Sequence, residues 1–440
     1  MANRNEGEEP SSRSNTSQDT PLISSTIVRS IIHLNEPLQQ GQRPITKPTL
    51  WQILKGSNIP MPFFPSPWTS HDGLGGDDIF PTCNTLLSTY ERRYGEVSCL
   101  AAGSDGLLYT GSCSKNIRVW KKGHPCGGFN DYQGPHYAIL LGPEDHVFVV
   151  SYDGRIRVWL NEATEETELP LYKRIMTLPI ISERLKEWFW RKKMRLERKF
   201  ERLYWHSFPT TCICLSEDKR YLYSGSTDHC MKIWRLEDWK FIEAKLDHKL
   251  GVTAVAAGCD CLVFSGSMDG SLIMWKRNED GERKKPTHTP VQYLLTEESP
   301  VSVLLLKSTD EAESGELYAG LWDGRVLVWK ERSHWSSYEV LPFRQAAITC
   351  LARSPGPLVF SGSADGRICA WRRRGSNSGH MLVTVISAHQ GPVNCIAAVE
   401  DWEEHDEGPS RCILYSGGTD KRLKTWRIAE CTVDPMQCGR

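Results

Sequence analysis

The sequence predicts an all-β protein, a seven-bladed β-propeller with a helical insertion between blades 2 and 3 and a disordered N-terminal tail. Three observations predict it. A short segment that ends in tryptophan recurs seven times, and a turn residue lies six positions before each tryptophan. Segments with period-two alternation precede each copy, and Asp-Gly turns separate several of them. Four antiparallel strands per repeat, arranged radially, define a propeller.

The tryptophan repeat is the first element of this prediction. The closing residues are Trp120, Trp159, Trp234, Trp275, Trp329, Trp371 and Trp426. Six copies have aspartate at the turn, namely Asp153, Asp228, Asp269, Asp323, Asp365 and Asp420. Ser114 takes this place in the first copy. A constant separation between turn and indole predicts one hairpin geometry repeated in every blade.

The strands that flank each hairpin are the second element. Alternating segments such as Val97–Ala101 and Ile348–Ala352 carry a small apolar residue at one equivalent position. A fourth strand is expected at Phe241–Leu246, Val291–Thr296 and Leu382–Ser387, each just before the next copy. β-branched enrichment and period-two alternation favour strands over helices here.

These residues resemble the WD40-repeat family, and the resemblance covers about residues 79–428. The histidine of that pattern survives as His206, His248 and His389, whereas no aspartate follows any of the seven tryptophans. The resemblance implies hydrogen-bonded networks of aspartate, histidine, serine and tryptophan within blades. His248, Ser265, Asp269 and Trp275 would form one; His206 with Asp228 and His389 with Asp420 would belong to others.

A narrower resemblance is to plant WD40 proteins of the JINGUBANG type. It is carried by Asp153–Trp159, Thr177–Pro179 and the basic insert that ends near Trp205. The segments Leu222–Ser226, Leu262–Ser267 and Leu358–Ser363 agree with it, as does Trp371-Arg-Arg. This resemblance implies a regulatory scaffold and no catalytic chemistry.

Domain boundaries follow from where the repeat begins and ends. Residues 1–78 are rich in Ser, Asn, Gln, Pro and Gly and are expected to be mostly disordered, although Leu50–Phe64 could dock on the propeller or act as a linear motif. The propeller is expected over 79–430, with the helical insertion at 180–206 and a tail at 431–440. Thr85–Tyr90 is expected to supply the missing outer strand of the last blade and thus close the ring.

Composition excludes several classes of partner. The 440 residues include 53 Lys+Arg and 54 Asp+Glu, so no global field indicates nucleic acid. No apolar run approaches the length of a membrane span, and no secretory signal is evident. The 15 cysteines contain no C-x-x-C pair, so we expect apolar core thiols and neither a metal site nor a cofactor. Cytoplasm or nucleus is the expected compartment.

Large side chains at predicted exposed turns mark a candidate partner site. The residue before each turn Asp should point to one rim of the ring, and Tyr152, Met268 and Trp322 are the bulky ones. Exposed aromatic residues are the usual anchors of protein interfaces. The alternative is that these side chains pack on neighbouring turns.

The insertion between blades 2 and 3 is a second candidate. Ser182–Trp205 is predicted to be an amphipathic basic helix that bears Trp188, Trp190 and the cluster Arg191, Lys192 and Lys193. Three interpretations stay open: a lid on the propeller, a docking site for an acidic partner segment, or capture of nucleic acid, an anionic lipid surface or a calmodulin-like protein.

Catalysis is the remaining alternative, because some propellers are hydrolases. The sequence has no G-x-S-x-G, H-E-x-x-H or P-loop motif. A His/Asp/Ser set resembles a triad, but a triad is needed once, whereas a structural network is needed in each blade. The sequence therefore predicts a non-catalytic scaffold that binds other proteins.

Overall fold

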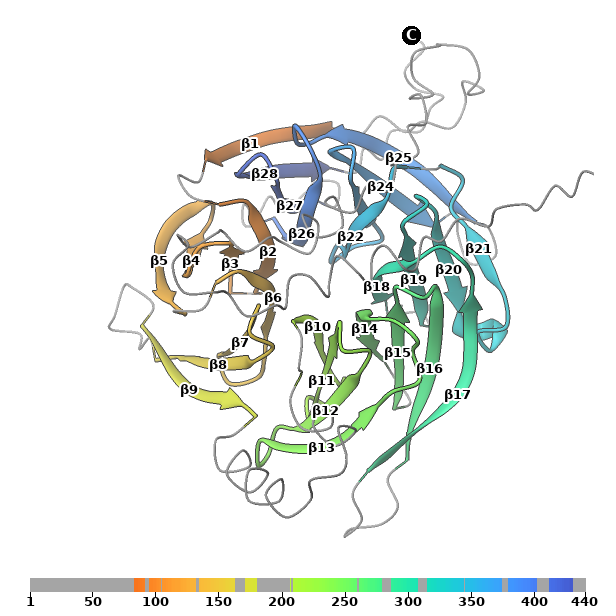
Figure 1. Ribbon diagram of the computed structural model, residues 1–440. Coiled ribbons are helices and arrows are strands. Elements are labelled where there is room, and N and C mark those ends of the chain that lie inside the picture. The colour runs from red at the N-terminus through yellow and green to blue at the C-terminus, as the bar shows by residue number, and fades with distance from the viewer. Residues whose placement is uncertain are drawn as a thin grey trace, which may run out of the picture.

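The chain forms a ring of seven four-stranded antiparallel sheets, seen in Figure 1 along the ring axis. The computed structural model describes residues 83–91, 95–103, 105–131, 134–162, 171–179, 206, 209–258, 261–278, 286–307, 315–343, 345–373, 379–401 and 411–429. The seven-bladed propeller expected from the repeat is confirmed.

Blades 1 to 4 follow one another along the chain, each running from the axis outward. Blade 1 contains β2 (Val97–Ala102), β3 (Leu107–Ser112), β4 (Asn116–Lys121) and β5 (His124–Asn130). Blade 2 contains β6 (His136–Leu141), β7 (His146–Ser151), β8 (Ile156–Asn161) and β9 (Tyr172–Leu178). Blade 3 contains β10 (Thr210–Leu215), β11 (Tyr221–Ser226), β12 (Met231–Arg235) and β13 (Lys240–Lys245). Blade 4 contains β14 (Val252–Ala257), β15 (Leu262–Ser267), β16 (Ser271–Asn278) and β17 (Thr287–Thr296).

Blades 5 to 7 complete the ring. Blade 5 contains β18 (Val301–Lys307), β19 (Glu316–Leu321), β20 (Val326–Lys330), the short 3-10 helix η2 (Glu331–Ser333) and β21 (Tyr338–Val340). Blade 6 contains β22 (Ile348–Arg353), β23 (Val359–Ser363), β24 (Arg367–Arg373) and β25 (His380–Ser387). Blade 7 contains β26 (Val393–Glu400), β27 (Arg411–Gly418) and β28 (Arg422–Ala429), with β1 (Cys83–Glu91) as its outer strand.

The ring is closed by the first described strand. β1 pairs antiparallel with β28, from Cys83 opposite Ala429 to Glu91 opposite Arg422, as Figure 1 shows at the edge of blade 7. The inner strands β2 and β26 lie side by side at the same junction. The expected closing strand at Thr85–Tyr90 is thus confirmed, and it satisfies the outer edge of β28.

Several predictions fall outside the described residues. These are the tail 1–78 with its apolar segment Leu50–Phe64, the C-terminal residues 431–440, and the insertion 180–206 apart from His206. Among the residues that the structure does describe, no helix has the length and hydropathy of a membrane span.

The apolar core is distributed over the junctions between blades. Within the described residues it divides into seven clusters, and each joins two neighbouring blades. At the junction of blades 3 and 4, Tyr223 and Ile233 pack against Val263 and Trp275, all at most 1% exposed. Each blade tryptophan is therefore a wedge between its own blade and the preceding one.

Most second strands carry a glycine close to their last residue, and close approach between blades requires it. A Cβ on Gly225 would lie 2.6 Å from Cys212 Sγ and 2.6 Å from Val252 Cγ1 of the next blade. A Cβ on Gly111 would lie 2.4 Å from Cys99 Sγ. The small strand residue recognised in the sequence thus packs against this glycine. Burial raises the pKa of the Cys212 thiol to about 12, as suits an apolar core position.

We expect Gly320→Ala to lower the free energy of unfolding by about 1–3 kcal/mol, because its Cβ would overpack the junction. That Cβ would lie 2.5 Å from Ile348 Cγ2 and 2.8 Å from Val303 Cγ1. Gly315→Ala is the matched control, since its Cβ would meet only the end of the Glu331 carboxylate, at 3.1 Å. Urea denaturation of both variants checks this, and equal stability of the two would contradict it.

Candidate functional site

Two ends of the propeller differ in what they display. We call upper rim the end that carries the turns between second and third strands and the connections between blades; the other end is the lower rim. The strand register places the connections between blades and these turns at the same end, because Val97 at the start of β2 pairs with Ser112 at the end of β3. The turn aspartates and the turn residues Tyr152, Met268 and Trp322 lie on the upper rim.

The turn aspartate closes the same local turn wherever it occurs. In all six copies its carboxylate accepts the backbone N–H of the residue two positions on: Arg155, Cys230, Ser271, Arg325, Arg367 and Arg422, at 2.8–3.2 Å. Four copies continue with a glycine in the left-handed region, for instance Gly154 at φ 72°. Asp-Gly therefore recurs because the carboxylate and the glycine each satisfy one requirement of a tight turn.

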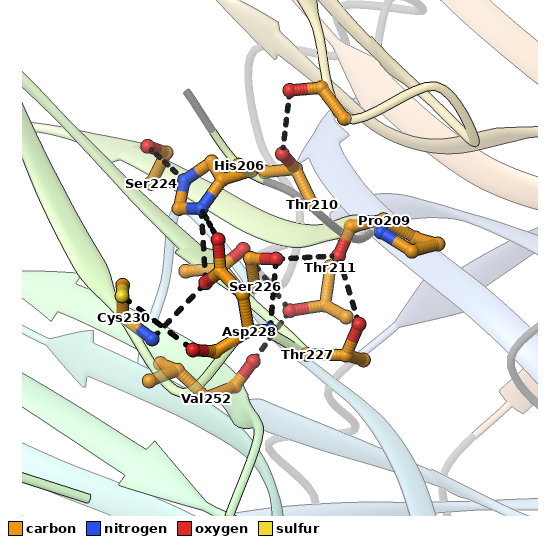
Figure 2. Close-up of polar contacts among 12 residues, drawn as sticks. His206, Pro209, Thr210, Thr211, Ser224, Ser226, Thr227, Asp228, Cys230 and Val252 are labelled. Atoms are coloured by element: carbon orange, nitrogen blue, oxygen red, sulfur yellow. Dashed lines mark hydrogen bonds and ion pairs between the residues drawn. The ribbon is translucent and has the colours of Figure 1, made fainter. Parts of the chain in front are cut away.

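Blade 3 contains a hydrogen-bonded network of histidine, aspartate, serine and tryptophan, and Figure 2 shows its His206, Ser224 and Asp228. His206 Nδ1 lies 3.0 Å from Asp228 Oδ2, and its Nε2 lies 2.9 Å from Ser224 Oγ. Trp234 Nε1 donates to the same Ser224 Oγ at 2.9 Å. Because the ionised Asp228 carboxylate can only accept, Nδ1–H of His206 donates to it, and Nε2 of the neutral imidazole accepts the Ser224 hydroxyl proton. The predicted pairing of His206 with Asp228 is confirmed.

Blades 4 and 7 contain close variants. His389 Nδ1 lies 2.9 Å from Asp420, its Nε2 lies 2.8 Å from Ser416, and Trp426 donates to Ser416. In blade 4, Ser265 joins His248 at 2.7 Å to Trp275 at 2.8 Å. There His248 Nδ1 contacts Ser271 Oγ at 2.7 Å, and Asp269 lies farther away at 3.8 Å. The expected network in blade 4 is therefore confirmed, with Ser271 inserted between histidine and aspartate.

Two further blades have networks that the sequence did not indicate. In blade 6, Ser361 donates to Gln345 Oε1 at 2.5 Å and accepts from Trp371 at 2.8 Å. His206, His248 and His389 each stand six residues before the small residue of the inner strand. Gln345 stands five residues before Cys350, so the fixed spacing missed it.

In blade 2 the buried group is Asp131, which stands seven residues before Ala138, the small residue of the inner strand β6. Ser151 donates to Asp131 at 2.8 Å and lies 3.2 Å from His136 Nδ1. Arg157 Nε lies 3.5 Å from the same Asp131 carboxylate. Burial raises the pKa of Asp131, and the Arg157 charge opposes that shift.

Electrostatics support a structural role for the blade 3 network. Burial opposes ionisation of Asp228, but its pair with His206 outweighs burial and holds the pKa of Asp228 below its ordinary value. Burial lowers the pKa of His206 against the opposing pull of Asp228. Asp228 is thus a carboxylate and His206 a neutral imidazole near pH 7. Ser224 is 0% exposed, so no substrate reaches its hydroxyl in this arrangement.

The candidate partner residues project from a rigid backbone. Tyr152, Met268 and Trp322 each donate their backbone N–H to a carbonyl of the preceding connection, at 3.0 Å in each case: Pro135, Gly251 and Pro300. Tyr152 and Trp322 are partly exposed, whereas Met268 is 6% exposed. The prediction of an exposed side chain is therefore wrong for Met268, which is part of the core.

The two partly exposed aromatic residues lie in blades that have lost the serine of the network. Val149 and Ala319 stand where blade 3 has Ser224, and the indole N–H of Trp159 has no partner among the described residues. Tyr152 lies with its ring 6.4 Å from that of Tyr137, the second residue of the inner strand β6. Blades 2 and 5 lie nearly opposite each other across the ring in Figure 1.

A surface ion network in blade 5 begins at Asp323, the residue after Trp322. Arg325 Nε lies 2.6 Å from Asp323, and its guanidinium also pairs with Glu297 of the preceding connection. Tyr338 on the outer strand β21 donates to Glu297 at 3.2 Å. Trp322 thus adjoins a charged, ordered patch that joins the upper rim to the outer edge.

The basic candidate residues of the insertion, Trp188, Trp190, Arg191, Lys192 and Lys193, lie outside the described residues. The described ranges contain no group of three His, Cys, Asp or Glu side chains that could hold a metal ion.

Seven blades and repeated buried networks define a seven-bladed β-propeller. The WD domain, G-beta repeat family matches residues 84–121, 198–235, 241–276, 337–372 and 380–427. The chain belongs to the WD40-repeat family.

Its relatives agree with that assignment. The chain is 27% identical over 217 residues to Protein ROOT INITIATION DEFECTIVE 3 of Arabidopsis thaliana, covering 44% of this chain and 46% of that protein. It is 25% identical over 288 residues to an F-box/WD-40 repeat-containing protein of Arabidopsis thaliana, covering 53% and 52%. It is 25% identical over 225 residues to Ribosome biogenesis protein YTM1 of Candida glabrata, covering 49% and 45%. The matches thus span about half the length of these relatives.

Proposed function

We propose that the chain is a non-catalytic scaffold that binds other proteins on its upper rim, through Tyr152 in blade 2 and Trp322 in blade 5. The observation that carries this proposal is the contrast among turn residues. Tyr152 and Trp322 are the aromatic residues at this position, both partly exposed, and both are held by backbone hydrogen bonds at 3.0 Å. Rigid aromatic side chains bind with little loss of conformational entropy.

The buried networks support the non-catalytic part of the proposal. A nucleophilic serine must reach its substrate, whereas Ser224, Ser265 and Ser416 are 0% exposed and bond to tryptophan. Repetition in three blades matches a structural network, whereas a catalytic triad is needed only once. By this proposal the protein acts as a regulatory adaptor in the cytoplasm or nucleus and resembles the JINGUBANG type.

The separation of the two aromatic positions shapes the expected partner. Because blades 2 and 5 lie nearly opposite each other, one partner that contacts both must span the mouth of the ring. The alternative is two partners that each bind one aromatic residue. The family's relatives include proteins named for ribosome biogenesis and for an F-box, and neither role is assigned to this chain.

We expect Tyr152→Ala and Trp322→Ala each to reduce partner capture at least tenfold while the free energy of unfolding stays within about 1 kcal/mol of wild type. Affinity purification followed by quantitative mass spectrometry measures capture, and urea denaturation measures stability. Both side chains are partly exposed, so truncation removes contact area without opening a core cavity.

Tyr293→Ala is the matched control, because Tyr293 is 52% exposed but lies on the outer strand β17 of blade 4. Its capture of partners should equal that of wild type. Unchanged capture by the two upper-rim variants would refute the assigned site. Loss of capture in all three variants would indicate a stability effect instead.

A further inference from the structure

The aromatic residue two positions before the blade glycine, or before Val150 in blade 2, alternates strictly along the chain. It is tyrosine in odd-numbered blades and phenylalanine in even-numbered ones: Tyr109, Phe148, Tyr223, Phe264, Tyr318, Phe360 and Tyr415. Each faces the following blade in the junction clusters. The contacts that these residues make alternate as well.

The junction of blades 3 and 4 is held by a clasp toward its lower rim. Tyr223 of blade 3 lies 3.1 Å, through its hydroxyl, from Nε2 of His288, the second residue of β17. Nδ1 of His288 contacts Glu243 of β13, and its backbone N–H donates to the same carboxylate at 2.8 Å. Two groups of blade 3, the Tyr223 hydroxyl and the Glu243 carboxylate, therefore contact the His288 imidazole of blade 4.

The same clasp recurs between blades 5 and 6. The Tyr318 hydroxyl lies 2.8 Å from His380 Nε2, and the His380 backbone N–H donates to Glu339 of β21 at 2.8 Å. Blades 4 and 6 each add an arginine that pairs with an acid of the preceding odd blade. Arg277 lies 2.6 Å from Asp218, and Arg373 lies 3.0 Å from Glu316.

Blades 1 and 2 use a simpler form of this contact. Tyr172 on the outer strand β9 donates its hydroxyl to that of Tyr109 at 3.0 Å. In each of the three odd-to-even junctions, the partner residue stands opposite the second residue after the blade tryptophan: Tyr172 opposite Asn161, His288 opposite Arg277, and His380 opposite Arg373.

Two of the even-to-odd junctions, between blades 2 and 3 and between blades 4 and 5, are packed differently. Phe148 of blade 2 lies 6.2 Å, between ring centroids, from Trp239 of blade 3. Phe264 of blade 4 lies 5.1 Å from Trp335 of blade 5. Both tryptophans follow the third strand and sit at φ 57°, in the left-handed region that directs them onto the preceding blade. Apolar ring packing thus replaces the hydrogen-bonded clasp.

A ring of seven breaks this alternation once, since blade 7 and blade 1 are both odd. At that junction the ring of Tyr90, from the closing strand β1, lies 5.0 Å from Trp120. β1 is joined to β28 of blade 7 by strand pairing, its Asn84 also donates to Thr384 of blade 6 at 3.4 Å, and most of its described side chains are exposed. The junction of blades 7 and 1 is therefore closed by β1, the strand that is not continuous in sequence with the other strands of its blade.

We propose that the ring is mechanically three two-blade units, 1+2, 3+4 and 5+6, closed by blade 7, and that blade 7 with β1 opens first. Opening at this point would admit or release a partner without unfolding the clasped blades. The proposal goes beyond the scaffold function and does not depend on Tyr152 or Trp322.

Hydrogen–deuterium exchange of the full chain tests the proposal. In wild type, amides of β26–β28 and β1 should exchange about tenfold faster than the equivalent amides of β14–β16. Tyr223→Phe should accelerate exchange in both blades 3 and 4 and leave blades 5 and 6 unchanged. Phenylalanine occupies this position naturally in even blades, so the variant should fold.

Tyr293→Phe is the matched control, because Tyr293 is 52% exposed on the same outer strand as His288. It should exchange as wild type does. Acceleration confined to blade 3, or spread evenly over all blades, would overturn the two-blade unit. Protection of β26–β28 and β1 equal to that of β14–β16 would overturn opening at blade 7.

Discussion

Replacing His206 with alanine is expected to lower the free energy of unfolding by about 3–5 kcal/mol. His206 is 4% and Asp228 2% exposed. The substitution removes the charge-assisted hydrogen bond to Asp228 and the bond to Ser224, and it leaves a cavity beside a buried carboxylate. Chemical denaturation at pH 7.5 measures the loss.

His124→Ala provides the control, since His124 begins the outer strand β5 and is exposed. Its effect should stay within about 0.5 kcal/mol, as for an ordinary surface substitution. If His206→Ala were equally mild, the network would not be a structural strut, and its repetition would need another explanation.

The same pair makes stability depend on pH in a defined direction. The pKa of His206 is lowered from its ordinary 6.5, so below pH 6.5 the unfolded chain binds a proton that the folded chain does not. Stability therefore falls as the pH decreases from 6.5 toward the folded pKa. The pKa of Asp228 is also lowered, so its contribution is lost at still lower pH. The loss between pH 7.5 and 5.5 should be smaller in His206→Ala than in wild type.

Trp275→Ala is expected to cost about 3–5 kcal/mol, whereas Trp322→Ala should cost about 1 kcal/mol or less. Trp275 is 0% exposed and fills the junction between blades 3 and 4, where its indole N–H donates to Ser265. Trp322 stands on a turn of the upper rim and is partly exposed. The two indoles thus separate a structural role from a binding role.

Thermal unfolding and partner capture, measured on the same two variants, check this separation. Trp275→Phe is a milder companion, because it keeps part of the ring packing while it loses the hydrogen bond and some buried volume; it should cost less than Trp275→Ala. Comparable destabilisation by Trp275→Ala and Trp322→Ala would contradict the assignment of Trp322 to a surface site.

The ring could be predicted from sequence because its determinants are local and repeated. A tight Asp-Gly turn and an indole at fixed separation specify one hairpin, and seven hairpins with strand-like flanks specify the blades. The closing strand at Thr85–Tyr90 followed from the need to cover an edge. The repeat spacing, the strand-like flanks and the need to cover an edge were sufficient for these inferences.

The rest depended on contacts between residues far apart in the chain. Gln345 and Asp131 take the role of the histidine, but each is shifted by one residue from the histidine's spacing to the inner strand. A search at fixed spacing does not detect them. The burial of Met268 depends on how neighbouring turns pack, and the clasp residue His288 lies 65 positions from Tyr223. The alternation of tyrosine and phenylalanine was visible in the sequence, but its meaning required the junctions.

Site-directed photo-crosslinking tests most directly whether the upper rim is the partner-binding face. A benzoyl-phenylalanine placed at Ala364 or Thr419 samples the upper-rim turns, and one placed at Lys122 or Glu144 samples lower-rim hairpins. We predict partner crosslinks from the upper-rim positions that disappear in the Tyr152→Ala and Trp322→Ala background. Crosslinks to the same partners from the lower-rim positions alone would contradict the proposed scaffold face.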